Sequence, residues 1–222
     1  MTIKAECLKV TRYFSGLGDE LDSISKFFFE KEADKGEVIL LEGDPAEVLY
    51  FVVSGVVKVF KTSADGKEQI LYLARPGDSF NDVPVFGGGE NLMSAGAMSS
   101  VVLCGIKKAD LEAMLQGNLQ LSLNVTGVLS RMVQYLVSLV EDLSFKNVTN
   151  RVAKILLEHA GDGAGGNPRL TQQEMAAIAG TAREMVGRSL KSLEEDGKIR
   201  LERHRIIITD QQALREMAGM PA

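Results

Sequence analysis

The residues best suited to chemistry lie near the carboxyl end of the chain, where Arg183, Glu184 and Arg188 follow one another at helical spacing. A guanidinium can bind O6 and N7 of guanine through two hydrogen bonds, and a carboxylate can accept from N4 of cytosine. On a helix these side chains fall opposite Val186 and Leu190, which are spaced for burial. The pattern predicts a helix that reads base edges in the major groove of DNA.

Local signals predict the elements that must position this helix. Thr171-Gln172-Gln173-Glu174 and Thr181-Ala182-Arg183-Glu184 both have the spacing of a capping box, and Gly180 lies between them. The second helix is expected to run to Asp196 and to stop at Gly197. Two short helices joined by a tight glycine turn predict a helix-turn-helix.

A basic hairpin is expected to follow, because residues 198–201 and 206–208 flank Glu202-Arg203-His204-Arg205. The tip of such a wing would contact phosphates, which position a protein without specifying sequence. The stretch Thr209-Asp210-Gln211-Gln212 then caps a final helix. The expected DNA-contacting residues are Thr171, Gln172, Thr181, Arg183, Glu184, Gly187, Arg188, Lys191 and Arg203, with Gly187 allowing close approach of the backbone.

Composition excludes several other functions. The 222 residues are 45% hydrophobic and 25% charged, which is typical of globular domains. Two cysteines supply neither a disulfide framework nor a four-thiolate iron–sulfur cluster, and two histidines leave little scope for zinc. We expect no metal site, no catalytic residues and no enzyme, because the sequence has no Walker loop and no nucleophile–histidine–acid set.

Charge is unevenly distributed along the chain. Residues 1–144 carry 13 Lys/Arg against 20 Asp/Glu, whereas residues 145–222 carry 12 against 10, within a net charge of −5. An acidic front and a mildly basic back favour two domains with different partners. The amino-terminal residues lack the apolar core of a signal peptide, and no run of 18 apolar residues occurs, so we expect a cytoplasmic protein without a membrane span.

Residues 35–106 have the pattern of an all-β domain. Short β-branched and aromatic runs alternate with turn sequences, and Asp65-Gly66 between two such runs is a hairpin signal. Strands this short favour a sandwich, jelly roll or barrel.

The helical period begins near Lys107, and a helix without proline is predicted over Leu119–Phe145. One apolar seam recurs at alternating steps of four and three residues, as in a coiled coil. A second stripe runs beside it, so one face can cover the β domain while the other pairs with a second copy. The simpler alternative is a helix buried within its own domain. The seam is Val125, Leu129, Met132, Leu136, Leu139 and Leu143, and the stripe is Leu121, Val125, Val128, Met132, Tyr135 and Leu139.

We therefore expect an α+β protein with three parts. Residues 1–118 form an effector-sensing β-roll, residues 119–145 a dimerisation helix and hinge, and residues 146–222 a winged-helix domain. The last part begins with a helix over Thr149–His159 and a glycine-rich loop over 161–168.

This order of elements, with Arg183-Glu184-Met185-Val186-Gly187-Arg188 on the reading helix, resembles the CRP/FNR family of bacterial transcription regulators across nearly the whole chain. The resemblance implies a cyclic-nucleotide-binding-like jelly roll and a homodimer that contacts RNA polymerase. It also implies a two-fold symmetric double-stranded DNA site with TGTGA-like halves, read by Arg183, Glu184 and Arg188.

The nucleotide pocket of that family does not match. The family uses a Gly-Glu pair for the ribose and an Arg-Ser/Thr-Ala triplet for the phosphate. Here Asn81-Asp82 stands for the pair, and Met93-Ser94-Ala95 stands for the triplet after a one-residue insertion. A phosphate buried beside Met93 and near Glu90 would have no cation. Cyclic AMP is therefore not the expected effector, although Gly87-Gly88-Gly89 offers backbone amides as well as a turn.

Haem is the family's other option, but neither histidine lies in the β domain, which leaves Cys7, Cys104, Met93 and Met98 as ligands. For each of them core packing is the simpler interpretation, and the spacing gives no support to a redox switch between Cys7 and Cys104. The alternatives to an effector-responsive regulator are a haem-based gas sensor and a sensor subunit acting through protein contacts. The expected effector pocket, suited to an uncharged or weakly cationic ligand, comprises Phe80, Asn81, Asp82, Val85, Phe86, Asn91, Met93, Ser94, Met132 and Tyr135.

Overall fold

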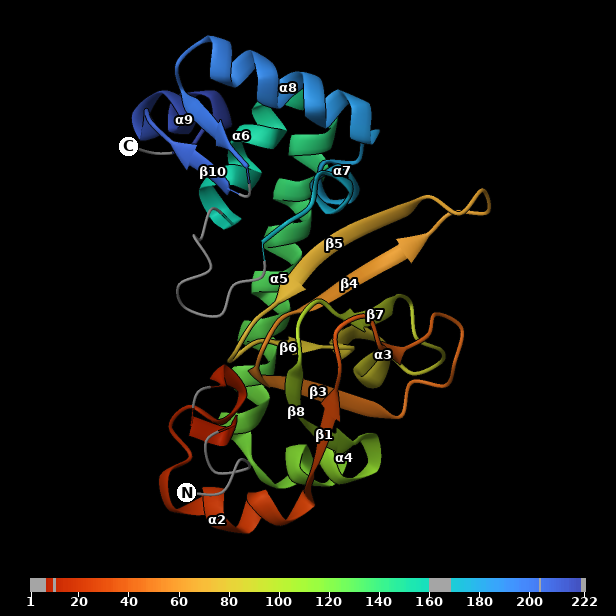
Figure 1. The fold of residues 1–222 in the computed structure, drawn as a ribbon. Coiled ribbons are helices and arrows are strands. Elements are labelled where there is room, and N and C mark those ends of the chain that lie inside the picture. Colours follow the sequence, from red (N-terminus) through yellow and green to blue (C-terminus); the bar gives the residue numbers. More distant parts are fainter. Residues whose placement is uncertain (1–6, 10, 160–168, 204, 221–222) are drawn as a thin grey trace. The chain divides into compact units, whose positions relative to one another are not determined.

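The computed structural model describes residues 7–9, 11–159, 169–203 and 205–220, so the predicted loop over 161–168 and His204 lie outside the described residues. The chain divides into two compact units. Unit 1 comprises Met1–Lys61 and Tyr72–Tyr135, and unit 2 comprises Thr62–Leu71 and Leu136–Ala222. The predicted α+β class is confirmed (Figure 1).

Residues 28–107 form two antiparallel four-stranded sheets (Figure 1), and the turn region Thr62–Leu71 is the part of them that belongs to unit 2. The first contains, in spatial order, β1 (Phe28–Ala33), β8 (Val101–Lys107), β3 (Val48–Ser54) and β6 (Ser79–Phe80). The second contains β2 (Val38–Leu40), β7 (Ser94–Ala97), β4 (Val57–Thr62) and β5 (Glu68–Ala74). The predicted strands all occur, and Gly66, at φ +80°, makes the predicted turn between β4 and β5.

Strand β8 is central in the first sheet and has apolar residues on both faces. Val101 and Leu103 pack with Val52 and Val59 in a cluster that joins the two sheets. Their neighbours along the strand, Cys104 and Ile106, point to the opposite face and belong to a second cluster. This alternation is the period-two pattern of a strand covered on both sides.

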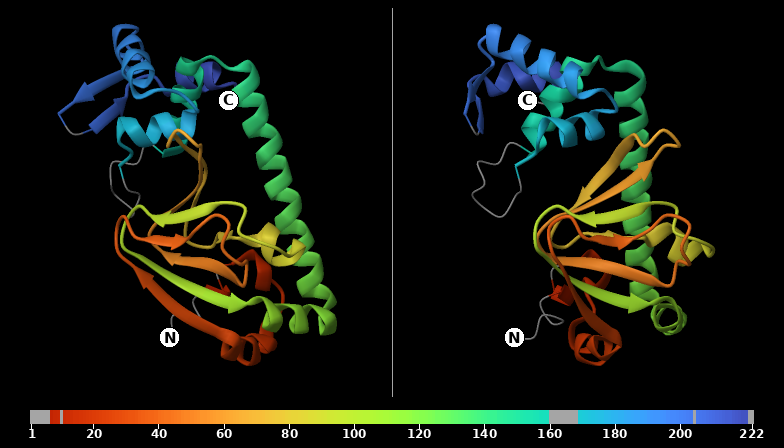
Figure 2. Two further views of the ribbon diagram at one scale, coloured as in Figure 1. Left: turned by 90° about the vertical axis from the view of Figure 1, so that its right-hand side faces the viewer. Right: turned by 45° about the vertical axis from the view of Figure 1, so that its right-hand side comes forward.

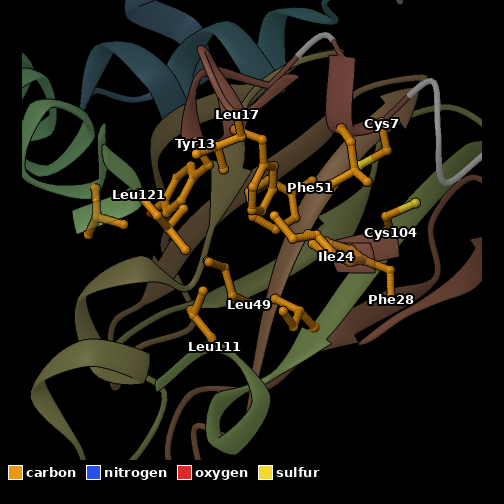
Figure 3. Packing of buried hydrophobic residues seen from close by; sticks show 14 of the residues in the cluster. Cys7, Tyr13, Leu17, Ile24, Phe28, Leu49, Phe51, Cys104, Leu111 and Leu121 are labelled. Carbon is orange, nitrogen blue, oxygen red and sulfur yellow. The ribbon is translucent and has the colours of Figure 1, made fainter. Parts of the chain in front are cut away.

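The second cluster is covered by helical segments. These are η1 (Arg12–Phe14), η2 (Gly18–Glu20), α2 (Leu21–Ile24), η3 (Ser25–Phe27), α3 (Asp82–Gly87), α4 (Lys108–Gly117) and the first half of α5 (Leu119–Phe145). Figure 3 shows Tyr13, Phe51 and Leu121 within this cluster. The Tyr13 ring meets Phe51 edge-on at 5.1 Å between centroids, a favourable aromatic geometry.

Two parts of unit 1 precede residues 35–106, the range whose sequence has the pattern of an all-β domain. Strand β1 pairs with β8 from Phe28↔Ile106 to Ala33↔Val101. The segment before it, around Tyr13 and Phe14, is buried in the second cluster. Strand β1 carries three consecutive charged residues, Glu30, Lys31 and Glu32, and its partner residues lie 68 to 78 positions further along the chain, so local sequence carries little signal for it.

Helix α5 has the predicted bounds, Leu119–Phe145, and a largely uncovered surface. Leu121 and Val125 are buried, whereas Val133, Val137 and Val140 are each at least 60% exposed. By length and composition alone this helix is apolar enough to cross a membrane, whereas the sequence led us to expect no membrane span. Only 6% of its most apolar 18-residue stretch is buried. It also carries Arg131, Glu141 and Asp142.

Unit 2 contains the winged helix. Its core is formed by α6 (Val148–His159), α7 (Gln172–Ala179), α8 (Arg183–Glu195), the hairpin β9 (Ile199–Glu202) and β10 (Arg205–Ile208), and α9 (Gln211–Ala218). Asp210 caps α9 by accepting a hydrogen bond from the amide of Ala213 at 2.9 Å. The predicted helix-turn-helix, hairpin and final helix are all present.

A buried carboxylate ties the end of α5 to this core. Asp142, 6% exposed, contacts Lys146 Nζ at 2.6 Å and Lys154 Nζ, on α6, at 2.5 Å. Lys146 also donates to the Ala218 carbonyl oxygen of α9 at 2.5 Å. Burial alone would raise the pKa of Asp142, but the hydrogen bonds and charges of the two ammonium groups hold it below its ordinary value.

Replacing this carboxylate should destabilise unit 2. Asp142→Asn removes two charge-assisted contacts, so the free energy of unfolding at pH 7 should fall by roughly 2 kcal/mol. Because the pKa of Asp142 is depressed in the folded state, its contribution is complete above the ordinary value of 3.8 and is lost as the pH falls through the folded value. Urea unfolding should therefore show a difference between wild type and variant that shrinks below about pH 4. Glu195→Gln, in an exposed pair with Lys191, is the control and should change little. A difference that persists at low pH would contradict the assignment.

Candidate nucleic-acid interface and effector site

The first helix of the helix-turn-helix begins with the predicted capping box. The Thr171 side chain accepts from the Glu174 amide at 3.2 Å, and Glu174 accepts from the Thr171 amide at 2.6 Å. The helix ends at Gly180, whose φ of +64° places it in the left-handed region that glycine tolerates. Both ends of α7 are therefore fixed by the residues that the sequence indicated.

The predicted second capping box is wrong. Helix α8 begins at Arg183, its N-cap is Ala182, and no side chain caps it. The amide of Thr181 donates to the carbonyl oxygen of Ala176, so Thr181 completes the end of α7. The tight turn thus uses the residue that the pattern placed at the start of α8.

Helix α8 separates a buried face from a charged one. Val186, Leu190 and Leu193 are buried in the core of unit 2. Arg183, Glu184, Arg188 and Lys191 are exposed, and Gly187 lies among them. Within the described part of the chain, neither Arg183 nor Arg188 forms an ion pair or hydrogen bond, whereas Lys191 lies 3.7 Å from Glu195. Both guanidinium groups are free to bind an external partner.

The remaining predicted contact residues surround this face. Thr171 and Gln172 are exposed at the start of α7, and Thr181 is half-buried in the turn. A Cβ on Gly187 would lie 3.7 Å from the Gln172 side chain, which shows how close the two helices are there. Figure 2 shows the β9–β10 hairpin beside α8. Glu202 in that hairpin pairs with Arg200 and Arg205, which leaves the exposed Arg203 unpaired among the described residues.

Asp82, which stands where the related family has its ribose-binding glutamate, is 1% exposed in unit 1. One carboxylate oxygen accepts hydrogen bonds from Ser79 Oγ, at 2.6 Å, and from the Tyr13 hydroxyl. Its other oxygen, Oδ2, has no partner among the described residues, and the same is true of the buried hydroxyl of Tyr72. Sequence reasoning missed Tyr13, Ser79 and Tyr72, because no local pattern brings a residue near the amino terminus to Asp82.

Asn81 adopts a strained conformation beside it. With φ at +74°, it is the one non-glycine residue in the left-handed region among those described. Its side-chain amide donates to the Val48 carbonyl at 3.0 Å and to Asn91 Oδ1 at 2.9 Å. Asn91 in turn donates to the Leu41 carbonyl at 3.0 Å. These bonds hold Asn81 where the related family has glycine.

The other predicted effector residues are divided between two clusters. Val85 and Phe86 belong with Tyr13 to the second cluster, whereas Phe80 and Met93 belong to the cluster that joins the sheets. Ser94 Oγ accepts from the Glu42 amide at 3.1 Å. On α5, Met132 is half-buried and the Tyr135 ring lies 6.3 Å from that of Tyr72. Asp82, Asn81 and Asn91 are thus the polar centre of the set.

This polar centre disfavours negative charge. Burial raises the pKa of Asp82, against the hydrogen bonds from Ser79 and Tyr13 that lower it. Burial, together with the nearby Asp82 carboxylate, also raises the pKa values of Tyr13 and Tyr72. The position of the family's phosphate-binding arginine is occupied by Met93. Among the described residues of unit 1, no lysine or arginine is buried.

The four residues that the sequence leaves as haem ligands lie within unit 1. Cys7, Cys104 and Met98 are buried, and Met93 is half-buried. In the described ranges no three side chains of His, Cys, Asp or Glu gather as a metal site would require.

Two family models match the chain. The model described as "Cyclic nucleotide-binding domain" matches residues 30–118, and "Crp-like helix-turn-helix domain" matches residues 150–217. The chain is 32% identical over 212 residues to the "Cyclic AMP receptor protein" of Thermus thermophilus, covering 95% of this chain and 98% of that one. It is 32% identical over 191 residues to the "CRP-like cAMP-activated global transcriptional regulator" of Mycobacterium tuberculosis, covering 83% and 85%.

Solved structures give the same result. A transcriptional regulator of the CRP/FNR family from Thermus thermophilus has a TM-score of 0.73 at 26% identity, covering 87% of this chain and 100% of that one. FixK2 from Bradyrhizobium japonicum has a TM-score of 0.77 at 26% identity, covering 88% and 99%.

Proposed function

This chain belongs to the CRP/FNR family of transcription regulators, and from that premise we propose that it acts as a homodimer whose β-roll responds to a small effector other than cyclic AMP. We propose that this dimer binds DNA, and the observation that carries the proposal is the exposed face of α8. Arg183 and Arg188 on that face have no partner in the described chain. A solvated charged face is common on isolated helices. Here it lies on the second helix of a capped helix-turn-helix beside a basic wing, which is the geometry of DNA readers.

The division of labour on DNA follows from side-chain chemistry. Arg183 and Arg188 bind guanine edges, and Glu184 accepts from cytosine. The phosphate backbone is contacted by Thr171, Gln172, Thr181, Lys191 and Arg203. Gly187 has no side chain, which lets the backbone of α8 come close to the DNA. A two-fold symmetric operator follows if two copies each present one such helix.

The uncovered surface of α5 supports the dimer. Its exposed apolar side chains include Val133, Leu136, Val137, Val140 and Leu143, which form a broad strip along the helix. Water contact along such a strip is unfavourable, and a second copy of the same helix would remove it. The Thermus and Mycobacterium relatives are named as a receptor and a global regulator, and dimerisation is typical of their family.

The effector proposal depends on what Asp82 and Met93 can bind. The relatives named above are described as cyclic AMP receptors or cAMP-activated. A buried phosphate needs charge-assisted donors, but the buried polar side chains around Asp82 are hydroxyls and amides, and no lysine or arginine is buried among the described residues. An uncharged or weakly cationic ligand that donates a hydrogen bond fits the unpaired Oδ2 of Asp82 better.

The remaining assignments complete the proposal. Residues 1–118 sense the effector, residues 119–145 form the dimerisation helix and hinge, and residues 146–222 bind DNA. The protein acts in the cytoplasm, contacts RNA polymerase as the family does, and has no catalytic role.

Operator selection tests the proposal. From a random pool of double-stranded DNA, the wild type should enrich a palindrome whose half-site centres lie about 34 Å apart. Arg188→Ala should cost about 1–3 kcal/mol in binding and relax the preference at one guanine. Lys191→Ala is the matched control, because loss of a phosphate contact weakens binding uniformly across sequences. Failure to enrich any palindrome, with or without cell extract, would refute the DNA function.

Light scattering at micromolar concentration tests the dimer. The wild type should have the mass of two chains, and Leu136→Glu should have the mass of one, because a buried unpaired carboxylate is costly. Gln134→Glu adds the same charge at an exposed polar position of α5 and should remain dimeric. A monomeric wild type would show that α5 is not the dimer seam.

Calorimetry tests the effector proposal. Wild type should show no micromolar binding of cyclic AMP, whereas Met93→Arg should gain measurable affinity by supplying a cation for the phosphate. Met93→Gln, which is neutral and of similar length, should gain none. The proposal is wrong if the wild type binds cyclic AMP at micromolar concentration and Asp82→Ala abolishes that binding.

A further inference from the structure

The chain's two cysteines meet in unit 1, although 96 residues separate them in the sequence. Neither Cys7 nor Cys104 is in a disulfide, and the two residues have exposures of 1% and 0%. The two side chains are joined by a hydrogen bond, and Figure 3 shows them side by side at one edge of the second cluster. Their spacing along the chain does not predict this pairing, because only the fold brings them together.

The two thiols sit on elements of different kinds. Cys104 lies in β8 at the centre of the first sheet, opposite Glu30 of β1 and Phe51 of β3. Cys7 precedes the segment that carries Tyr13 and is held on the sheet by apolar packing. A bond between the sulfurs would attach that segment covalently to the sheet.

We propose that Cys7 and Cys104 form a reversible dithiol–disulfide pair that a peroxide oxidises. One thiol, as its thiolate, attacks a peroxide oxygen, breaks the O–O bond and becomes a sulfenic acid, and hydrogen peroxide releases its other oxygen as water. The second sulfur then attacks the sulfenic sulfur, forms the S–S bond and expels a second water molecule. Two thiols and one hydrogen peroxide thus yield one disulfide and two water molecules, with two electrons passing from sulfur to oxygen.

The surroundings determine how this pair reacts. The hydrogen bond with Cys104 and burial raise the pKa of the Cys7 thiol, so thiolate is scarce and the first step is slow. The adjacent sulfur then intercepts the sulfenic acid before a second peroxide reaches it, which favours disulfide over sulfinic acid. In a reducing compartment such a pair rests as dithiol and is oxidised transiently.

Oxidation would attach to the sheet the segment that carries Tyr13, whose hydroxyl donates to Asp82. The Tyr13 hydroxyl donates to Asp82 Oδ1, and Asn124 Nδ2 of α5 donates to the carbonyl oxygens of Tyr13 and Ser15 at 2.9 and 2.8 Å. The disulfide would add a covalent link to these contacts. Its expected structural effect is slower opening of the segment around Tyr13.

Peptide mapping of the folded full-length chain under non-reducing conditions tests the bond. Hydrogen peroxide should produce an intramolecular link between the peptides of Cys7 and Cys104, lighter by two hydrogen atoms and reversed by dithiothreitol. Cys7→Ser and Cys104→Ala should each abolish the link. Sulfinic acid at either residue, links only between chains, or unreacted thiols would each overturn the proposal.

Hydrogen exchange compares each protein with itself before and after oxidation, so the result does not depend on how stable a variant is. In wild type, amides near Tyr13 should exchange several-fold more slowly after oxidation, and reduction should restore the original rate. Peroxide should leave the exchange rate of Cys7→Ser unchanged. An equal slowing in that variant would show that the disulfide is not the cause.

Discussion

Strand β8 packs against apolar layers on both of its faces, and this constraint organises unit 1. Val101 and Leu103 must match the second sheet, while Cys104 and Ile106 must match the helical layer. At Gly105 a Cβ would approach the Phe29 ring to 2.4 Å, so the neighbouring strand leaves no room for a side chain. A one-residue slip would exchange the two faces and disrupt both clusters, which makes the register of β1 and β3 on β8 strongly specified. The amino-terminal segment, α4 and α5 all pack on the face that this register creates.

Unit 2 is also constrained by an element with two different faces, helix α8. Helix α8 must bury Val186, Leu190 and Leu193 while it leaves two guanidinium groups unpaired, so the apolar face carries the stability and the charged face remains available. Asp142 attaches the end of α5 to α6 by ion pairs. Removing one partner of a buried ion pair leaves a charge without compensation, so this link tolerates little change.

The two units depart from their family to different degrees. Helix α8 carries the arginines and glutamate of the predicted pattern, whereas Met93 stands at the position that the resemblance assigns to a phosphate-binding cation, and phenols lie near Asp82. The polar residues of the expected effector set, Asn81, Asp82 and Asn91, are not members of the two apolar clusters on which the β-roll packs. Ligand chemistry can therefore change while the fold persists, and family membership alone does not identify the effector.

Elements with local signals could be predicted from the amino-acid sequence alone. The bounds of α5, the cap at Thr171, the glycine turn at Gly180 and the apolar face of α8 all follow from spacing within a few residues. The second capping box failed because a turn of few residues can assign Thr181 to either helix, and contacts with Ala176 decided between them. Other features depend on the tertiary structure: the pairing of strand β1, the hydrogen bond from Tyr13 to Asp82, and the contact between Cys7 and Cys104. Each joins residues many tens of positions apart, and such pairings depend on which surfaces remain to be buried once the local elements have formed.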